Sequence, residues 1–254
     1  MDLQLAESNA SYKITSEQSG LVNTEASPYY TAPVARSVAG GLTFSVDGNA
    51  PVRPLSLAVK RVLDVVLSAL ALVALLPLLV LVAIAIKVTS PGPVLFVQQR
   101  PGLHGALFPM LKFRTMYNHM GDRSGLQQTV KNDQRITRIG AFLRRTSIDE
   151  LPQLINILLG HMSIIGPRPH PVRMLAGGMD YQQLVPYYAK RWEMRPGLSG
   201  WAQVNGLRGP TDRAEVAVAR INHDLAYIQN FSIQLDIKII VATLWREFVG
   251  GSGF

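Results

Sequence analysis

The stretch KRVLDVVLSALALVALLPLLVLVAIAIKV, residues 60–88, decides the fold of this 254-residue chain. It carries no charged side chain from Val65 to Ile86, a run of 22 residues. As a straight helix this run would be about 33 Å long, close to the hydrocarbon thickness of a bilayer. Buried helices of soluble proteins are rarely so long and so uniformly apolar. The stretch therefore predicts a membrane helix.

Two features of this segment favour a bent helix that enters and leaves by the same face of the membrane. Pro77 lies near its middle, where a proline frees a backbone carbonyl and kinks the helix. Basic residues, which prefer the cytoplasmic side, flank both ends: Lys60 and Arg61 before, Lys87 and Arg100 after. The periodicity alone also allows a kinked helix that spans the bilayer, which would put the N-terminal residues and the basic body on opposite sides.

The composition differs on the two sides of this segment. Residues 1–52 are rich in Ser, Ala, Gly, Thr and Asn and lack the pattern of a signal peptide, so we expect a disordered polar tail. Residues 1–50 carry two basic against five acidic side chains, a charge of −3. Because the net charge of the whole chain is +8, the remaining residues carry +11. A basic body suggests an anionic partner, but the scattered Lys and Arg residues and the missing fold motif argue against nucleic acid.

The pattern after the membrane segment predicts a compact, helix-rich α+β domain over residues 91–250. Residues 90–116 read as short β-rich pieces broken by Pro and Gly, and residues 191–209 as a glycine-rich loop. Apolar side chains recur at helical spacing in residues 211–229 and 233–248. These two amphipathic helices either cover a core or lie at the membrane interface, and the sequence does not choose. The chain has no cysteine, which excludes disulfides and thiolate metal sites.

The stretch RTSIDELPQL, residues 145–154, places two carboxylates side by side. One interpretation is helix capping, because Ser147 and Glu150 have the spacing of a capping box and acidic residues are stabilised in a first turn. Pro152 then puts the start of the helix close to Asp149. The other interpretation is that Asp149 and Glu150 carry out chemistry. Taken alone, the stretch favours capping.

Several blocks together resemble a known family, the bacterial sugar transferases. They are KRVLDVVLSALALVALLPLL, QQRPGLHG, LKFRTM, LRRTSIDELPQLINILLGHMSIIGPRP and RPGLSGWAQVNGLRG, in the family's order and spacing. The similarity covers about residues 55–250 and is closest to the compact, single-module members, which are monotopic phosphoglycosyl transferases. It implies a re-entrant membrane helix at residues 53–90, followed by a cytosolic catalytic domain at residues 91–250.

The resemblance also implies a reaction. Such enzymes transfer a sugar-1-phosphate from a UDP-sugar to undecaprenyl phosphate, release UMP, and start exopolysaccharide or related glycan synthesis at the cytoplasmic face of the bacterial inner membrane. By the same resemblance Asp149 is the nucleophile of a covalent phosphosugar intermediate, and Glu150 helps to hold Mg²⁺. The NGLRG block favours a hexose, glucose before galactose. The alternative is a non-catalytic membrane-bound scaffold of the same fold, and the oligomeric state, monomer or homo-oligomer, stays open.

The chemistry of the residues agrees with this implied role. A carboxylate can attack phosphorus to give an acyl phosphate, provided that the negative charge of the target is neutralised. Mg²⁺ binds a few carboxylate oxygens together with substrate phosphates, so it needs no Cys or His cluster. Adjacent residues on a helix point about 100° apart, so Asp149 and Glu150 are expected to have separate roles.

Further residues are candidates for contacts with phosphate or nucleotide. Arg144 and Arg168 are predicted phosphate clamps because Arg grips phosphate with two parallel bonds, and Lys112 is a weaker candidate. Arg208 follows Leu207, the position at which some relatives carry the arginine, so its role stays open. Asp224 and Tyr227 match a D-x-x-Y feature of the family, with Asp224 expected to bond within the fold. No histidine is assigned, and the glycine-rich loop adds three candidate contacts, Arg195, Gln203 and Asn205.

Overall fold

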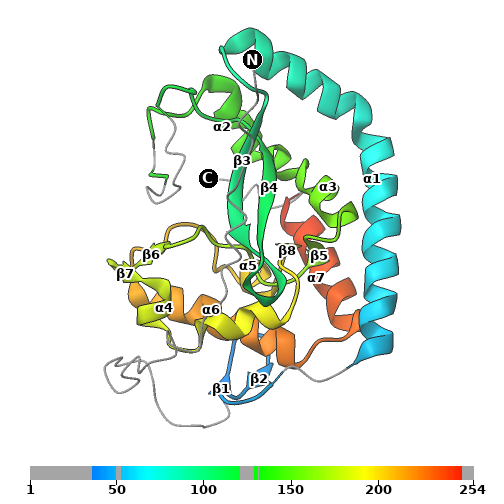
Figure 1. Cartoon of the computed structure of the whole chain (residues 1–254), viewed down its shortest axis with the longest axis vertical. Coiled ribbons are helices and arrows are strands. Elements are labelled where there is room, and N and C mark those ends of the chain that lie inside the picture. Colours follow the sequence, from blue (N-terminus) through cyan, green and yellow to red (C-terminus); the bar gives the residue numbers. More distant parts are fainter. Residues whose placement is uncertain (1–35, 50–52, 121–128, 131, 248–254) are drawn as a thin grey trace, which may run out of the picture.

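The computed structural model describes residues 36–49, 53–120, 129–130 and 132–247. A body of short helices and small sheets lies along one side of a single long helix, so the fold is α+β as predicted (Figure 1). The helices are α1 Pro54–Thr89, η2 Leu103–Gly105, α2 Arg138–Arg145, η3 Ile148–Glu150, α3 Gln153–Leu158, α4 Tyr181–Leu184, η4 Tyr188–Glu193, α5 Trp201–Val204, α6 Ala214–Gln229 and α7 Ile233–Trp245. The strands are β1 Arg36–Ser37, β2 Thr43–Phe44, β3 Leu95–Pro101, β4 Leu107–Phe113, β5 Ser163–Ile165, β6 Leu175–Ala176, β7 Met179–Asp180 and β8 Gly197–Ser199.

Helix α1 is the predicted membrane segment. It has 36 residues, and its most apolar window has a mean hydropathy of 3.1, so by length and composition it is able to cross a membrane. Pro54 opens the helix, where the missing N–H costs nothing, and Pro77 lies inside it. Figure 1 shows the axis of α1 changing direction towards its upper end, and an internal proline is the commonest cause of such a bend.

Polar side chains fasten the first turns of α1 to the body. Lys60 Nζ lies 2.6 Å from Oδ2 of Asp236 on α7, and both side chains are buried. The carboxylate of Asp64 accepts a 2.9 Å hydrogen bond from the backbone N–H of Ile164 in β5. Beyond these residues, apolar side chains of α1 pack against two small clusters of the body, the first of Phe108, Met110, Leu154, Ile157 and Met162 and the second of Phe113 and Leu143.

Both ends of α1 are joined to the same body. Before the helix, the Arg53 guanidinium donates to the carbonyl of Phe231, between α6 and α7. After the helix, the guanidinium of Arg114 donates to the carbonyls of Ser90, at 2.8 Å, and Pro91. The chain therefore leaves the body at one end of α1 and returns to it at the other.

The sheets are small, and two of them position the site. Strands β3 and β4 form an antiparallel hairpin in the register Leu95↔Phe113, which confirms the β-rich reading of residues 90–116. Strands β5 and β8 pair in parallel, and the backbones come very close just past β5: a Cβ on Gly197 would lie 2.1 Å from the backbone nitrogen of Gly166. Glycine at these two positions therefore allows the loop after β5 to lie against β8.

The main core forms around α6, which is buried over most of its surface. The sequence left open whether the helix in residues 211–229 covers a core or lies at the membrane interface, and the structure shows that it belongs to the core. Helix α7 differs, because Leu235, Asp236 and Ile239 face inward while its opposite side is apolar and exposed. That exposed side carries Ile237, Val241, Leu244 and Trp245.

Residues 36–49 are folded, although we expected the polar tail to extend to residue 52. Strands β1 and β2 form a hairpin whose Phe44 is 3 % exposed in the main core, and the side chain of Gln229 bonds both the N–H and the carbonyl of Ser45. Leu42, Phe44 and Val46 alternate with Thr43 and Ser45, a short strand pattern in an otherwise polar stretch, and these three side chains pack into the main core. Residues 1–35 and 50–52 lie outside the described residues.

Candidate active site

The Asp-Glu pair lies on the short turn η3, between α2 and α3. Ser147 precedes this turn with a positive φ of 55°, a left-handed conformation that is uncommon outside glycine. Its hydroxyl donates to Oε2 of Glu247, at 3.1 Å, and does not cap a helix. Helix α3 begins later, at Gln153. The capping-box interpretation was therefore wrong, because the Glu150 carboxylate binds two cations instead of a backbone N–H.

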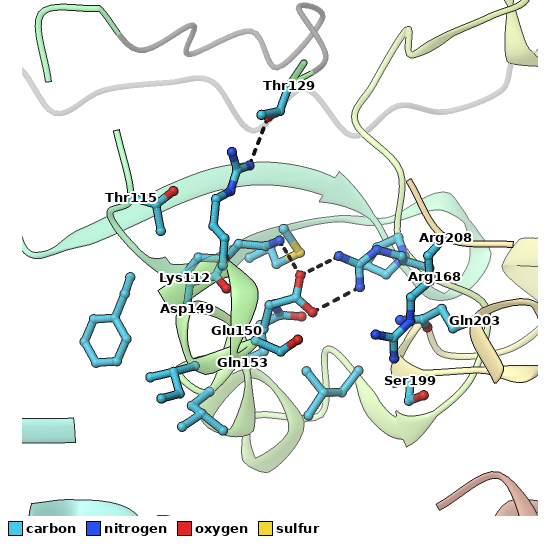
Figure 2. Close-up of a pocket in the computed structure, with 18 of the residues that line it drawn as sticks. Lys112, Thr115, Thr129, Asp149, Glu150, Gln153, Arg168, Ser199, Gln203 and Arg208 are labelled. Carbon is cyan, nitrogen blue, oxygen red and sulfur yellow. Dashed lines mark hydrogen bonds and ion pairs between the residues drawn. The ribbon is translucent and has the colours of Figure 1, made fainter. Parts of the chain in front are cut away.

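Glu150 is held by one cation from β4 and another from the loop after β5. Lys112 Nζ lies 2.7 Å from Oε1, and the Arg168 guanidinium donates to both carboxylate oxygens, with 3.1 Å from Nη1 to Oε2 (Figure 2). Burial opposes the charge of Glu150, but Arg168 and Lys112 outweigh it and hold the pKa of this carboxyl well below its usual range. Glu150 is therefore ionised, and it fixes the positions of both cations.

Asp149 has a different environment from its neighbour. Its side chain is 7 % exposed, and no hydrogen bond to its carboxylate is present among the described residues. Burial raises the pKa of Asp149 to about 6, against the opposing effect of Lys112. The two carboxylates thus have separated ionisation properties, as expected for residues with different roles.

The pair lines a cavity of about 690 Å³, a volume within the usual range for small-molecule sites. Two further arginines hold the loop that carries Arg168. Arg191 Nη2 donates to the Arg168 carbonyl at 2.6 Å, and Arg100 Nη1 donates to the Pro169 carbonyl at 3.0 Å. Arg191 is itself paired with Asp224 at 2.8 Å. Asp224 thus bonds within the fold, as we expected.

The structure brings most of the predicted site residues together. Lys112, Arg144, Arg168, Gln203 and Arg208 line the cavity with Asp149 and Glu150. Figure 2 shows Arg168, Gln203 and Arg208 on one side of Glu150, and Lys112 close to the pair. The Arg144 guanidinium donates to the Thr129 hydroxyl at 3.0 Å, and that of Arg208 donates to Glu247 at 2.6 Å.

Two predicted contacts do not line this cavity. Arg195 Nε donates to the carbonyl of Gly160 at 3.0 Å, and Asn205 Nδ2 donates to the carbonyl of Trp201 at 2.8 Å. The Asn205 bond is local, at the end of α5, whereas the Arg195 bond joins this loop to the loop after α3.

Other residues of the cavity were not predicted to belong to the site. Glu247, just after α7, joins Ser147 to Arg208, although 100 residues separate it from Ser147. Arg100 was considered only as a flank of the membrane segment. Arg220 and His170 also line the cavity. A cavity-facing charge within an otherwise ordinary helix or strand leaves no spacing signal, so only the family pattern could have indicated these positions.

The donor atoms suit a magnesium ion. A carboxylate offers about four acceptor positions. Lys112 and Arg168 use three of these positions on Glu150, and no donor in the described part of the chain uses those of Asp149. These hard oxygens are ligands that Mg²⁺ prefers. Since no group of three or more His, Cys, Asp or Glu residues that could hold a metal occurs in the described part of the chain, the remaining ligands would be phosphate oxygens and water.

Comparison with known proteins finds a family and several relatives. The sequence model of the bacterial sugar transferases matches residues 55–250. The chain is 55 % identical over 200 residues to the exopolysaccharide production protein PSS of Rhizobium leguminosarum bv. phaseoli, covering 79 % of this chain and 100 % of that protein.

Two longer relatives carry a more specific name. An undecaprenyl-phosphate glucose phosphotransferase of Komagataeibacter xylinus is 45 % identical over 85 % of this chain and 40 % of its own length. A UDP-glucose:undecaprenyl-phosphate glucose-1-phosphate transferase of Escherichia coli (strain K12) is 44 % identical over 81 % of this chain and 44 % of its own length. The chain thus spans less than half of these two relatives. With a family match from residue 55 to residue 250, this chain belongs to the bacterial sugar transferases.

Proposed function

We propose that the chain transfers a sugar-1-phosphate from a UDP-sugar to undecaprenyl phosphate and releases UMP. The observation that carries the proposal is the buried, unbonded Asp149 carboxylate beside a Glu150 that holds two cations, at the wall of a large cavity. The names of the relatives favour glucose as the sugar, before galactose, and exopolysaccharide synthesis as the setting.

The reaction then proceeds by two displacements at one phosphorus. An oxygen of Asp149 attacks the β-phosphorus of the donor, and the bond from that phosphorus to the oxygen bridging the two phosphates breaks. UMP leaves with this oxygen, and the phosphosugar remains on Asp149 as an acyl phosphate. A phosphate oxygen of undecaprenyl phosphate attacks the same phosphorus next, which restores the carboxylate and gives undecaprenyl diphosphate-sugar.

The surrounding residues make the first attack feasible. A carboxylate and a pyrophosphate repel each other, so the charge on the phosphate must be neutralised where it develops. Lys112 and Arg168 supply two fixed cations beside Asp149, and Glu150 orients both. Arg144, at the end of α2, adds a third cation to the cavity wall. Mg²⁺ held by Glu150 would supply further neutralisation of the pyrophosphate.

The membrane geometry suits a lipid acceptor. The body contacts both ends of α1, which supports a re-entrant helix bent near Pro77 over a spanning one. The exposed apolar side of α7 lies on the same body and suits contact with the acyl region, while the α7 residues Thr243 and Leu244 line the cavity. We therefore place the cavity at headgroup level on the cytoplasmic face of the bacterial inner membrane.

The test uses purified protein in nanodiscs with Mg²⁺ and UDP-glucose labelled in its β-phosphate, without acceptor lipid. Label should stay on the protein through denaturation, and Asp149→Asn should abolish it. Asp212→Asn, at an exposed position, is the matched control and should label like the wild type.

Each other outcome contradicts a different part of the proposal. Label that persists in Asp149→Asn would rule out this nucleophile. UMP release only after the acceptor is added, with no label before, would keep the transferase and exclude the covalent intermediate. No label and no UMP release with UDP-glucose, UDP-galactose or their N-acetyl analogues would leave the non-catalytic scaffold.

A further inference from the structure

Arg220, on α6, is a buried cation without a carboxylate partner. It is 5 % exposed, its Nη2 donates to the carbonyl of Gly209 at 2.9 Å, and its buried Nε has no partner. No acidic side chain of the described residues lies within ion-pair distance of it. Asp224, one turn further along the helix, forms an ion pair with Arg191 at 2.8 Å. A buried charge is costly unless it is paired, so Arg220 is suited to binding an anionic ligand.

A second cation in the same cavity is likewise without a carboxylate among the described residues. The terminal nitrogens of Arg100, on β3, donate to the carbonyl of Pro169 and to the side chain of Gln98. Its buried Nε has no partner among the described residues. The charge of Arg168, close to it, is already taken by Glu150. Both Arg100 and Arg220 line the cavity that contains Asp149.

His170 offers a further hydrogen-bond donor, because its neutral ring carries the proton on Nε2. Nδ1 lies 3.4 Å from Nη1 of Arg191, which can only donate, and 3.1 Å from the Tyr188 hydroxyl. Burial and the nearby arginines, Arg191 first, lower the pKa of His170 well below its usual value, so the ring is neutral. Nδ1 is then the acceptor, and the proton is on Nε2, which is buried and has no partner.

This part of the cavity therefore offers unmatched N–H donors and positive charge. A sugar is a poor match, because its hydroxyls donate as well as accept. A phosphate is a good match, because it is anionic and its oxygens accept. In the proposed reaction the β-phosphate belongs at Asp149, beside Lys112 and Arg168, so the phosphate available for a neighbouring site is the α-phosphate.

We propose that Arg220 and Arg100 bind the α-phosphate of the nucleotide donor, the phosphate that leaves on UMP, with His170 as a further donor. The inference rests on the proposed function. When the bond to the bridging oxygen breaks, the leaving UMP gains negative charge at the α-phosphate. A fixed, unneutralised guanidinium at that position stabilises the charge as it develops, which accelerates departure of UMP.

The test compares binding of UMP with binding of uridine, which has the same base and ribose but no phosphate. Isothermal titration calorimetry would compare the wild type, Arg220→Gln and Arg220→Lys in nanodiscs. The matched control is Arg213→Gln, because the side chain of Arg213 is 78 % exposed at the start of the same helix. Arg220→Gln should weaken UMP binding by about 10- to 100-fold and leave uridine binding unchanged. Arg220→Lys should recover part of the UMP affinity, and Arg213→Gln should match the wild type.

Several results would overturn the inference. Equal affinity of the wild type and Arg220→Gln for UMP would exclude a phosphate contact, and an equal loss of affinity for UMP and uridine would show a structural role. If the wild type binds no UMP, the proposed function fails as well, so the two failures are distinguishable.

A kinetic readout separates the nucleotide from the lipid as the source of the phosphate. Arg220→Gln should slow formation of the labelled intermediate from UDP-glucose and leave its discharge by undecaprenyl phosphate unchanged. The opposite pattern, normal formation with slow discharge, would assign the site to the phosphate of the lipid and overturn the proposal. Thermal unfolding of each variant without nucleotide checks that the fold is retained.

Discussion

In the proposed reaction Asp149 attacks phosphorus only as a carboxylate, yet its burial raises the pKa to about 6. The reactive form therefore increases as the pH rises through this value. We predict that the rate of intermediate formation, measured in single turnovers with subsaturating labelled UDP-glucose, rises from about pH 5 to a plateau by about pH 8. A rate that is flat across this range, or that falls, would contradict the assignment of Asp149 as nucleophile.

The same ionisation affects stability. Because the folded state holds the Asp149 proton up to a higher pH than the unfolded state, the free energy of unfolding falls as the pH rises from about 4 to about 6. A shift of this size corresponds to about 3 kcal/mol at neutral pH. We predict that Asp149→Asn raises the unfolding temperature at about pH 7.5, and that the difference from the wild type shrinks near pH 4. Thermal unfolding in one detergent at both pH values checks this, and a destabilised variant at about pH 7.5 would contradict it.

At the residue scale, the sequence was informative where several blocks coincide. Asp149, Glu150 and Arg168 belong to the family pattern, and the structure brings them together. Glu247 and Arg220 stand in helical segments whose spacing indicates only a helix, so their contacts with the cavity depend on tertiary packing. Arg195 and Asn205 show the reverse: the composition of their loop suggested ligand contacts, but their side chains bond to backbone carbonyls.

Among the elements, α1 depends on a buried ion pair for its attachment. Lys60 lies 2.6 Å from Asp236, which also accepts a 2.6 Å hydrogen bond from the Tyr227 hydroxyl. We predict that Lys60→Met lowers the free energy of unfolding by about 3 to 5 kcal/mol, because Asp236 is left buried and unpaired. Lys87→Met, at an exposed position on the same helix, should have little effect. Thermal unfolding in nanodiscs compares them, and equal unfolding temperatures for the two variants would contradict the prediction.

Elements were predictable from the sequence where their signal is local. Helix α1 fits within the predicted residues 53–90 because a long apolar run needs no distant partner to be recognised. The β1–β2 hairpin was missed because its two-residue strands depend on bonds to Gln229 and Asn230 in and after α6. The start of α3 was misplaced because the left-handed Ser147 turns the chain before the helix begins.

For the whole molecule, the topology in the membrane can be tested directly because the chain contains no cysteine. We predict that Ser37→Cys and Asp212→Cys, at exposed positions before and after α1, both react with a membrane-impermeant maleimide in inside-out vesicles. Neither should react in right-side-out spheroplasts, since a re-entrant helix keeps both on the cytoplasmic side. Labelling of the two cysteines from opposite sides would show that α1 spans the bilayer.

The attachment of α1 has a consequence for the order of events during synthesis. Lys60 and Asp236 are 176 residues apart, and Ser45 and Gln229 are 184 apart. At the usual rate of translation, roughly 10 to 35 seconds separate the emergence of the first member of each pair from that of the second. The apolar helix is thus available to the targeting machinery well before the body that fastens it is complete. In the proposed setting, delivery to the membrane then precedes assembly of the body, so the body completes its fold at the lipid surface.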